Sequence, residues 1–259
     1  MYFCDGMKTF LQLLVCLCFF SHCANDPSIN AKRIDTPLPV IIVRTDTLVA
    51  RDTIPAKSEI ELKLEALGLI DIAELDSSLH VDLRYSTTRN FTGKDMYGDL
   101  NRCYFQPDVA VKLVKAQALL KLQFPSYSLL ILDGARPVSI QQYMWDSVNL
   151  LPINRQKYLS NPANKSLHNY GAAVDVTIVD SLGIELDMGT PYDYFGDLAQ
   201  PRKEDQFVAD GTLTDSQLEH RQLLRSVMCA SGFSRIETEW WHFNSTSRLR
   251  ASEIYPVID

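Results

Sequence analysis

The chain has 259 residues, of which 46% are hydrophobic and 22% are charged, a composition typical of a globular protein with one large domain or two small ones. Its formal net charge of −7 argues against a nucleic-acid-binding protein, because such proteins normally carry a basic stripe. The sequence shows no internal repeat and no low-complexity tract.

Residues 1–23 are typical of an export signal or a lipoprotein signal. Lys8 precedes the apolar run FLQLLVCLCFF at 10–20, which is too short to span a bilayer as a mature helix. Small residues flank Cys23, so this cysteine could be lipidated and could tether the protein to a membrane. Ordinary cleavage near Ala24 is the alternative. We expect an exported protein, either periplasmic or anchored as a lipoprotein.

Residues 24–56 carry four prolines and scattered charges without a sustained period, which predicts a flexible tether. The remaining residues, 57–259, are expected to form a single domain. Of the six cysteines, only Cys103 and Cys229 are certain to belong to this domain. In an exported protein, two cysteines permit one disulfide bond.

The first predicted element is a short helix through EIELKLEALGL, which Ser58 would cap. Residues 79–85 then alternate like a strand. A longer amphipathic helix is predicted at 106–123, with apolar residues at helical spacing on one face and lysines facing water. These residues are Val111, Val114, Ala118 and Leu122 on the apolar face, and Lys112, Lys115 and Lys121 on the polar face.

The middle of the domain is predicted to contain two buried strands with a helix between them. The first strand covers 127–133 and ends at Asp133, and the helix begins directly after Pro137. The second strand, AAVDVTIVD, covers 172–180. Its alternation predicts two distinct faces.

The C-terminal part is predicted to contain a helix and a pair of strands. The helix, at 214–232, opens with a capping box of Thr214 and Gln217. The strand pair contains FSRIETEWWHF at 233–243. Helices and strands are mixed without a regular βαβ alternation, so we predict the α+β class with a central antiparallel sheet and flanking helices.

A histidine and an aspartate stand together around the second buried strand. His168 lies seven residues before Asp175. Val174, Val176 and Ile178 share one face of the strand, so Asp175 points to the other face. A carboxylate on the face away from the core can line a cleft, and the preceding loop can fold His168 over the same face.

The stretch ETEWWHF places Glu239 three residues before His242. A catalytic zinc site needs three nitrogen or oxygen ligands and an open position for water. His168, Asp175 and His242 supply two imidazoles and one carboxylate. Glu239 is then a candidate base for the water molecule. Since residues three apart point to opposite faces of a flat strand, the chain must bend between Glu239 and His242.

Each of these patterns also has an ordinary structural explanation. The spacing of histidine and aspartate often arises by chance, and EWWH is often the edge of an aromatic core with an acid at the surface. Their occurrence together argues against chance, as does Arg136 in DGARP directly after a buried strand. The end of a strand is a common place for a functional side chain.

In these motifs the chain resembles the zinc D-alanyl-D-alanine dipeptidases. SLHNYGAAVDV resembles the SxHxxGxAxD motif of this family, and EWWH resembles its ExxH motif. The family includes the vancomycin-resistance dipeptidases and is grouped with D,D-carboxypeptidases and Hedgehog-like domains. The resemblance extends over most of residues 65–243 through four further segments: DLRYSTTRNFTGKDMYG, LDGARP, DMGTPYDYFG and LLRSVMCASGF. It implies a Hedgehog/D,D-peptidase-like fold with 57–259 as the catalytic domain.

The resemblance implies a role for several residues. One Zn²⁺ per chain would be held by His168, Asp175 and His242, and Glu239 would act as general base and general acid. Arg136 would be the cation that stabilises the tetrahedral intermediate. Ala135 departs from the family pattern, because a tyrosine is common before the arginine.

The substrate implied by the resemblance is a small molecule, the dipeptide D-Ala-D-Ala. Ser166 would contact its carboxylate, and Tyr85 and Asp193 would contact its free ammonium group. The predicted signal and tether are additions to the usual cytoplasmic form of the family.

Two alternative functions remain open. A D,D- or L,D-carboxypeptidase acting on longer peptidoglycan stem peptides would not need a group that binds a free ammonium, so Tyr85 and Asp193 favour the dipeptidase. A non-catalytic zinc-containing binding module, as among the Hedgehog-like relatives, should lack the base or the arginine. Glu239 and Arg136 are both present, which argues against this module.

Overall fold

The structure, a computed structural model, describes residues 56–148, 155 and 159–259. The predicted signal at 1–23 and all but the last residue of the predicted tether therefore lie outside the described residues. No helix in the described part of the chain has both the length and the apolar character needed to cross a bilayer.

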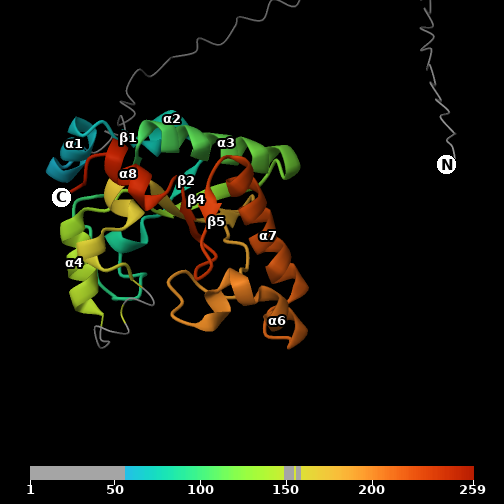
Figure 1. Cartoon of the computed structure of the whole chain (residues 1–259). Helices are drawn as coiled ribbons and strands as arrows, with labels where there is room; N and C mark the ends of the chain where they lie inside the picture. The colour runs from blue at the N-terminus through green and yellow to red at the C-terminus, as the bar shows by residue number, and fades with distance from the viewer. Residues whose placement is uncertain (1–55, 149–154, 156–158) are drawn as a thin grey trace, which may run out of the picture. The chain divides into compact units, whose positions relative to one another are not determined.

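A five-stranded sheet forms the centre of the domain, with its strands in the order β2-β4-β5-β7-β6 (Figure 1). The pairs β4–β5, β5–β7 and β6–β7 are antiparallel, whereas β2–β4 is parallel because α3 carries the chain back between these two strands. The α+β class and the central sheet are thus confirmed, with one parallel pair that was not expected. The strands are β2 (His80–Val81), β4 (Ser128–Asp133), β5 (Ala173–Val179), β6 (Ser234–Arg235) and β7 (His242–Asn244).

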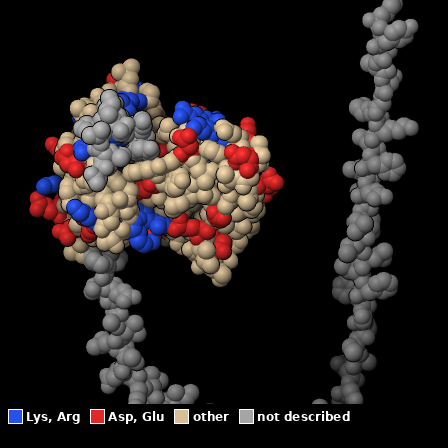
Figure 2. Space-filling view, turned by 90° about the horizontal axis from the view of Figure 1, so that it is seen from below, with Lys and Arg blue, Asp and Glu red and all other residues tan. Residues whose placement is uncertain are grey.

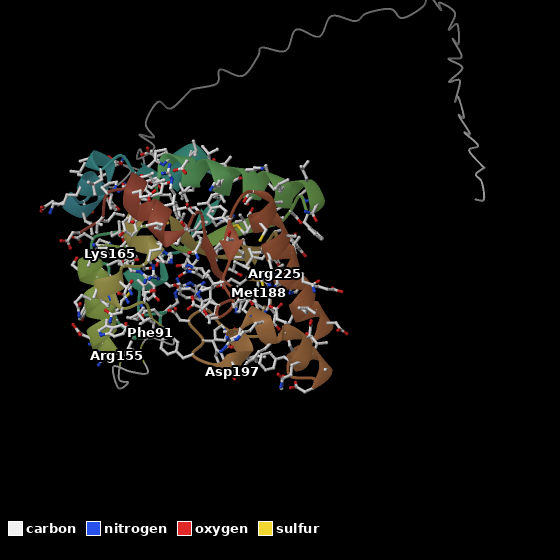
Figure 3. All side chains as sticks on the ribbon, viewed as in Figure 1. Phe91, Arg155, Lys165, Met188, Asp197 and Arg225 are labelled. Carbon is white, nitrogen blue, oxygen red and sulfur yellow. The ribbon has the colours of Figure 1, made fainter. Side chains whose placement is uncertain are left out.

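Helices flank the sheet, and a small antiparallel sheet pairs β1 (Ile70–Asp71) with β3 (Tyr104–Phe105). The α-helices are α1 (Glu59–Ala66), α2 (Ile72–Leu75), α3 (Pro107–Gln123), α4 (Val138–Ser147), α6 (Glu204–Ala209), α7 (Asp215–Ala230) and α8 (Arg248–Ile254). The 3-10 helices are η1 (Arg84–Ser86), η2 (Pro162–Asn164), η3 (Leu167–Tyr170), η4 (Asp197–Ala199) and η5 (Pro201–Lys203). Figure 3 shows Phe91 and Arg155 on the side of α4, and Met188 and Arg225 on the side of α6 and α7.

The helix start signals in the sequence are confirmed. Ser58 caps α1 and Thr214 caps α7, and each forms a reciprocal capping box with the residue three positions on. The helix after Pro137 is also confirmed as α4. The strand predicted at 79–85 is wrong in length, because β2 contains only two residues and the chain then turns into η1.

The long helix is confirmed as α3, but its predicted buried face is wrong. Val111 is 61% exposed and Leu122 is 80% exposed. The helix carries two apolar stripes at helical spacing, and Gln117 belongs to the buried one. Its side chain accepts a hydrogen bond from Leu129 N at 2.8 Å and donates one to Ser78 O at 2.8 Å, which fixes its own stripe against β4. The buried residues are Val109, Ala110, Leu113, Ala116, Gln117 and Leu120.

The disulfide that the sequence permits is not formed, because Cys103 and Cys229 are both free thiols. Cys103 is buried and packs under Gly134, where a Cβ added to the glycine would lie 2.6 Å from the sulfur. Cys229 is exposed on α7. The two side chains therefore lie in different environments.

Packing in the core determines which side chains of β5 are buried among apolar residues and which face the neighbouring polar side chains. Val174, Val176 and Ile178 belong to the main apolar cluster and are fully buried, as the alternation predicted. Asp175 therefore lies on the opposite face of the strand. In the antiparallel registers, Asp175 stands beside His242 of β7 and beside Asp133 at the end of β4. Three polar side chains thus meet across neighbouring strands.

Candidate active site

A cavity of about 490 Å³ opens beside these strands. The surface of the domain is hollowed on this side, with acidic and basic side chains near the hollow (Figure 2). Every site residue proposed from the sequence lines the cavity: Tyr85, Arg136, Ser166, His168, Asp175, Asp193, Glu239 and His242. The structure thus brings together residues that are up to 157 positions apart in the chain, from Tyr85 to His242.

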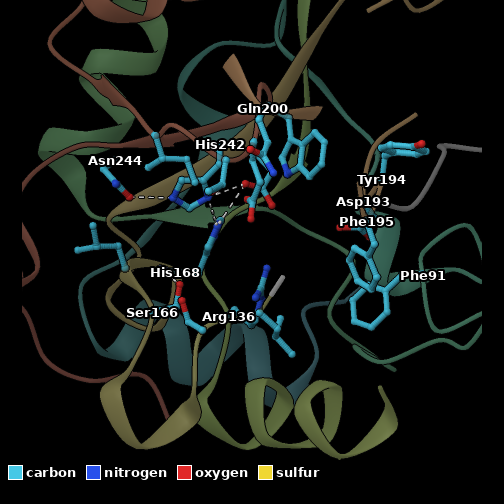
Figure 4. Close-up of a pocket in the computed structure, with 18 of the residues that line it drawn as sticks. Phe91, Arg136, Ser166, His168, Asp193, Tyr194, Phe195, Gln200, His242 and Asn244 are labelled. Atoms are coloured by element: carbon cyan, nitrogen blue, oxygen red, sulfur yellow. Dashed lines mark hydrogen bonds and ion pairs between the residues drawn. The ribbon is translucent and has the colours of Figure 1, made fainter. Parts of the chain in front are cut away.

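Three potential metal ligands converge at the centre of the cavity (Figure 4). His168 Nε2 lies 3.2 Å from His242 Nδ1 and 3.4 Å from Asp175 Oδ1, and His242 Nδ1 lies 2.9 Å from the same oxygen. Within the described residues, one donor atom from each of the three side chains lies within 4.8 Å of the other two. Two imidazole nitrogens and one carboxylate oxygen match the ligands of a catalytic zinc site.

The outer nitrogen of each imidazole has its own acceptor. His168 Nδ1 lies 2.8 Å from Gly134 O, and His242 Nε2 lies 2.8 Å from Asn244 Oδ1. Because a carbonyl oxygen can only accept, each outer nitrogen carries the hydrogen and donates it. When both imidazoles are neutral, the inner nitrogens, His168 Nε2 and His242 Nδ1, carry the lone pairs, and these point to a common position.

The carboxylate of Asp175 is also held from outside the site. Tyr192 donates its hydroxyl to Asp175 Oδ2 at 2.9 Å, so Oδ1 remains available on the side of the two imidazoles. Burial opposes ionisation, but His168 and His242 hold the pKa of Asp175 well below its ordinary value. Burial likewise lowers the pKa of His242, and Asp175 outweighs this and raises it to about 9. At neutral pH His242 therefore holds a proton against the Asp175 carboxylate, and a metal bound between these side chains would displace it.

Glu239 lies in the segment that links β6 to β7, outside both strands. The bend required to bring Glu239 and His242 to one site is thus present. Burial in the cavity raises the pKa of Glu239 to about 7, and the negative charge of Asp175 adds to this effect, while His242 opposes it. Such a carboxyl group exchanges protons near neutral pH.

The two tryptophans between Glu239 and His242 anchor this segment. Trp240 donates its indole hydrogen to Thr190 Oγ1 at 2.8 Å, and Trp241 packs edge-on against Tyr192. Trp241 is only 3% exposed. The segment is therefore anchored directly after Glu239 by two buried aromatic rings, which limits the positions that this side chain can adopt.

Arg136 is a buried cation in the wall of the cavity. It follows β4 by three residues, and its Nε donates to Asp133 Oδ2 at 3.1 Å while Nη1 donates to Gln141 Oε1 at 2.7 Å. Its guanidinium carbon lies 5.1 Å from the centre of the Tyr85 ring. These contacts fix its orientation, and the charge of Asp133 keeps the guanidinium protonated by holding its pKa above the ordinary value despite burial.

Asp193 lies at the end of the cavity away from Ser166 (Figure 4), and Tyr85 contacts it there. Tyr85 donates its hydroxyl to Asp193 Oδ1 at 3.0 Å. Asp193 Oδ2 is buried and has no hydrogen-bond partner among the described residues. Burial raises the pKa of Asp193 well above its ordinary value, with a further contribution from Asp175. Within the described part of the chain, the carboxyl group of Asp193 therefore lacks a hydrogen-bond donor at Oδ2 and a paired positive charge.

Ser166 lies on the other side of the histidine pair (Figure 4). It is the N-cap of η3, and its Oγ accepts a hydrogen bond from His168 N at 3.3 Å. The same short helix thus positions a candidate metal ligand and a hydroxyl group of the cavity wall. Ser166 and Asp193 flank the histidines from opposite sides, which gives the cavity two distinct ends.

Four residues that orient this site could not be assigned this role from the sequence, namely Tyr192, Asn244, Asp133 and Gln141. The sequence contained one indication of the role of Asn244, because alternation along a strand places it on the same face as His242. Tyr192 had only its position next to Asp193. Contacts of this kind depend on the tertiary fold, since they join elements that are distant in sequence.

Comparison with known proteins gives a consistent result. A family described as D-ala-D-ala dipeptidase (Peptidase_M15) matches residues 65–258. The D-alanyl-D-alanine dipeptidase of Escherichia coli K12 is 28% identical over 190 residues, which cover 73% of this chain and 89% of that protein. The D-alanyl-D-alanine dipeptidase of Enterococcus faecium is 29% identical over 192 residues, which cover 68% of this chain and 91% of that protein.

A solved structure of a vancomycin-resistance D,D-pentapeptidase, VanY, in complex with Zn(II), is also similar to this chain. The two are 14% identical with a TM-score of 0.36, and the match covers 60% of this chain and 80% of that one. A likeness of this size carries no weight for function.

Proposed function

Because the chain belongs to the D-Ala-D-Ala dipeptidase family of peptidases, we propose that it hydrolyses the dipeptide D-Ala-D-Ala to two molecules of D-alanine with the help of one zinc ion. The observation that carries the proposal is the position of the donor atoms of His168, Asp175 and His242 in the same cavity as Glu239 and Arg136. These are the parts that metal-assisted hydrolysis of an amide requires.

The donor set suits zinc. His168, Asp175 and His242 offer two nitrogens and one oxygen within 4.8 Å of one another, and the bonds to Gly134 and Asn244 direct the lone pairs of the imidazoles inward. When bound, zinc would supply a Lewis acid that polarises the scissile carbonyl and lowers the pKa of a water molecule.

Glu239 is proposed to move the proton. With a pKa of about 7, its carboxylate can take a proton from the attacking water and then, as a carboxylic acid, donate it to the nitrogen of the breaking C–N bond. The water oxygen forms the new bond to the carbonyl carbon, and the second D-alanine leaves with a neutral amino group. A pKa near neutrality allows Glu239 both to accept the proton from water and to donate it to the leaving nitrogen.

Arg136 is proposed to stabilise the negative charge that develops on the carbonyl oxygen. Its guanidinium group is already fixed by Asp133 and Gln141, so little reorganisation is needed during the reaction. The cation can therefore favour the transition state over the neutral substrate.

The two ends of the cavity support a dipeptide as substrate. Asp193 Oδ2 is a buried oxygen without a partner, and the ammonium group of a free amino terminus would supply both a donor and a positive charge. Tyr85, which already bonds the other oxygen, would hold the carboxylate in place. Ser166 at the opposite end would contact the substrate carboxylate. A carboxypeptidase for longer peptides has no use for the group at Asp193.

The experiment that tests this proposal compares D-Ala-D-Ala with N-acetyl-D-Ala-D-Ala in the presence of zinc. Acetylation removes the charge that Asp193 would pair with, and loss of such a contact costs about 2–5 kcal/mol, or about 30- to 5,000-fold in kcat/KM. Release of D-alanine from the free dipeptide should be faster by this factor. Equal rates on the two substrates would favour the carboxypeptidase, and no release from either would reject the proposal.

We also propose that the protein is exported. Lys8 and the apolar run at 10–20, both outside the described residues, support this location. Mass spectrometry of the mature amino terminus distinguishes a lipidated Cys23 from cleavage near Ala24. A protein that retains the run at 10–20 would contradict export by a cleaved signal.

A further inference from the structure

The cavity extends beyond Ser166 to Ser247 and Arg248. Neither of these two residues has a role in the proposed reaction. Arg248 is the first residue of α8 and Ser247 is its N-cap. This helix packs against η3, since Ala251 shares an apolar cluster with Leu167 and Tyr170. Because Ser166 is the N-cap of η3, this packing holds Ser247 and Arg248 at the Ser166 end of the cavity.

Two hydroxyl groups at this end have a hydrogen left to donate. Ser166 Oγ accepts from His168 N at 3.3 Å, and Ser247 Oγ accepts from Arg250 N at 3.1 Å. A hydroxyl group that accepts in this way still carries its own hydrogen. Neither group donates it to another described residue. Both can therefore donate to an oxygen atom in the cavity.

Arg248 differs from the other arginine of the cavity in its charge balance. The charge of Arg136 is compensated by Asp133, with which it forms a buried ion pair. Arg248 is exposed at the rim and forms no hydrogen bond or ion pair with any described residue. Its positive charge is therefore available to a ligand.

The acids of the cavity lie elsewhere. Asp175 contacts both histidines and Glu239 stands three residues before His242, whereas Asp193 lies at the far end, beyond the histidine pair (Figure 4). The cavity thus has an uncompensated carboxylate at one end and an uncompensated guanidinium group at the other. This arrangement matches a short zwitterion whose two charges lie on either side of the reacting bond.

We propose that Arg248, together with the hydroxyl groups of Ser166 and Ser247, forms the subsite for the carboxylate of the substrate's C-terminal residue. This subsite rests on the proposed hydrolysis of D-Ala-D-Ala and adds Arg248 as a residue that determines specificity. It does not take part in breaking the bond. Its contribution therefore appears in substrate binding, as a change in KM rather than in kcat.

The test uses Arg248→Gln with two substrates, D-Ala-D-Ala and its C-terminal amide, which lacks the negative charge. For the dipeptide, kcat/KM should fall about 5- to 20-fold through KM, since an exposed guanidinium group contributes less than a buried one. The amide should be cut at the same rate by both proteins. Arg248→Lys retains the charge and should recover part of the loss.

Arg250→Gln is the matched control. Arg250 lies on the same helix, is exposed, and pairs with Glu253 at 3.2 Å outside the cavity, so this variant should behave as the wild type. An equal loss on the dipeptide and on its amide in Arg248→Gln, or no loss on either, would overturn the subsite.

A wild-type chain that releases no D-alanine points to failure of the proposed function and not of the subsite. The subsite is then tested by calorimetric titration of zinc-loaded protein with D-Ala-D-Ala. Binding that weakens in Arg248→Gln and not in Arg250→Gln supports the carboxylate subsite, and binding that is equal in both variants, or absent from the wild type, rejects it.

Discussion

Replacement of Asp193 by asparagine should weaken catalysis and at the same time stabilise the fold. Asp193 Oδ2 is a buried oxygen without a partner, so the free protein carries an unfavourable group that a substrate ammonium would satisfy. The residue has a φ angle of 60°, a left-handed conformation that asparagine adopts more readily than most residues. Tyr85 can still donate to the Oδ1 of asparagine, so the substitution removes the charge with little change of shape.

The size of the catalytic loss follows from this contact. A hydrogen bond to a charged group contributes about 1.5–3 kcal/mol, and the asparagine keeps the shape but not the charge. The kcat/KM for D-Ala-D-Ala should therefore fall about 10- to 150-fold. N-acetyl-D-Ala-D-Ala has no ammonium group, so its slow hydrolysis should hardly change. The ratio between the two substrates should shrink by the same factor.

The change in stability should depend on pH in a defined direction. Burial raises the pKa of Asp193 in the folded protein well above its value of 3.8 in an unfolded chain. Its contribution to stability is therefore fully present below about pH 4 and is lost as the pH rises through the folded-state pKa. Asparagine does not titrate. The gain in melting temperature of Asp193→Asn over the wild type should thus be small at pH 4 and larger at pH 8.

The assay measures D-alanine release from both substrates and thermal unfolding at both pH values. Asp197→Asn is a matched control, because Asp197 belongs to the same part of the chain but is exposed and pairs with Lys203 at the surface. This control should retain the substrate ratio of the wild type. An Asp193→Asn protein with equal losses on both substrates, or with unchanged stability at pH 8, would refute the reasoning.

Three further predictions concern the centre of the site. Glu239→Gln should keep zinc but lower kcat about 10²- to 10⁴-fold, because an amide cannot transfer the proton; near-native turnover would remove Glu239 from the mechanism. His168→Ala and His242→Ala should each lose zinc during dialysis, whereas full metal occupancy in both would contradict the ligand assignment. Asn244→Ala should raise the dissociation constant for zinc about 10- to 100-fold, measured by competition with a chelator, because His242 loses the acceptor that orients its ring. An unchanged constant would mean that this hydrogen bond does not position the ligand.

The sequence predicted that His168, Asp175, Glu239 and His242 come together, from two local rules and the family resemblance, and the structure places all four in one cavity. Strand alternation separated Asp175 from its apolar neighbours, and the EWWH stretch required a bend near Glu239; both features are present. The family resemblance then connected these residues with Arg136 and Asp193. Each of them lines the same cavity.

Other features could not be predicted, because they depend on which of two similar arrangements packs better. Helix α3 carries two apolar stripes, and the buried one includes Gln117, which bonds Ser78 and Leu129 in distant segments. Two cysteines alone say nothing of their distance, so the possible bond between Cys103 and Cys229 could be judged only from the fold. In both cases the deciding contacts join segments that are far apart in the sequence.

The most direct test of the central claim is a titration of metal-free protein with zinc while D-alanine release from D-Ala-D-Ala is followed. The His168, Asp175 and His242 site predicts that activity is absent at first, rises with added zinc and levels off at one zinc per chain. Full activity in the metal-free protein, or no activity with one zinc bound, would contradict the account.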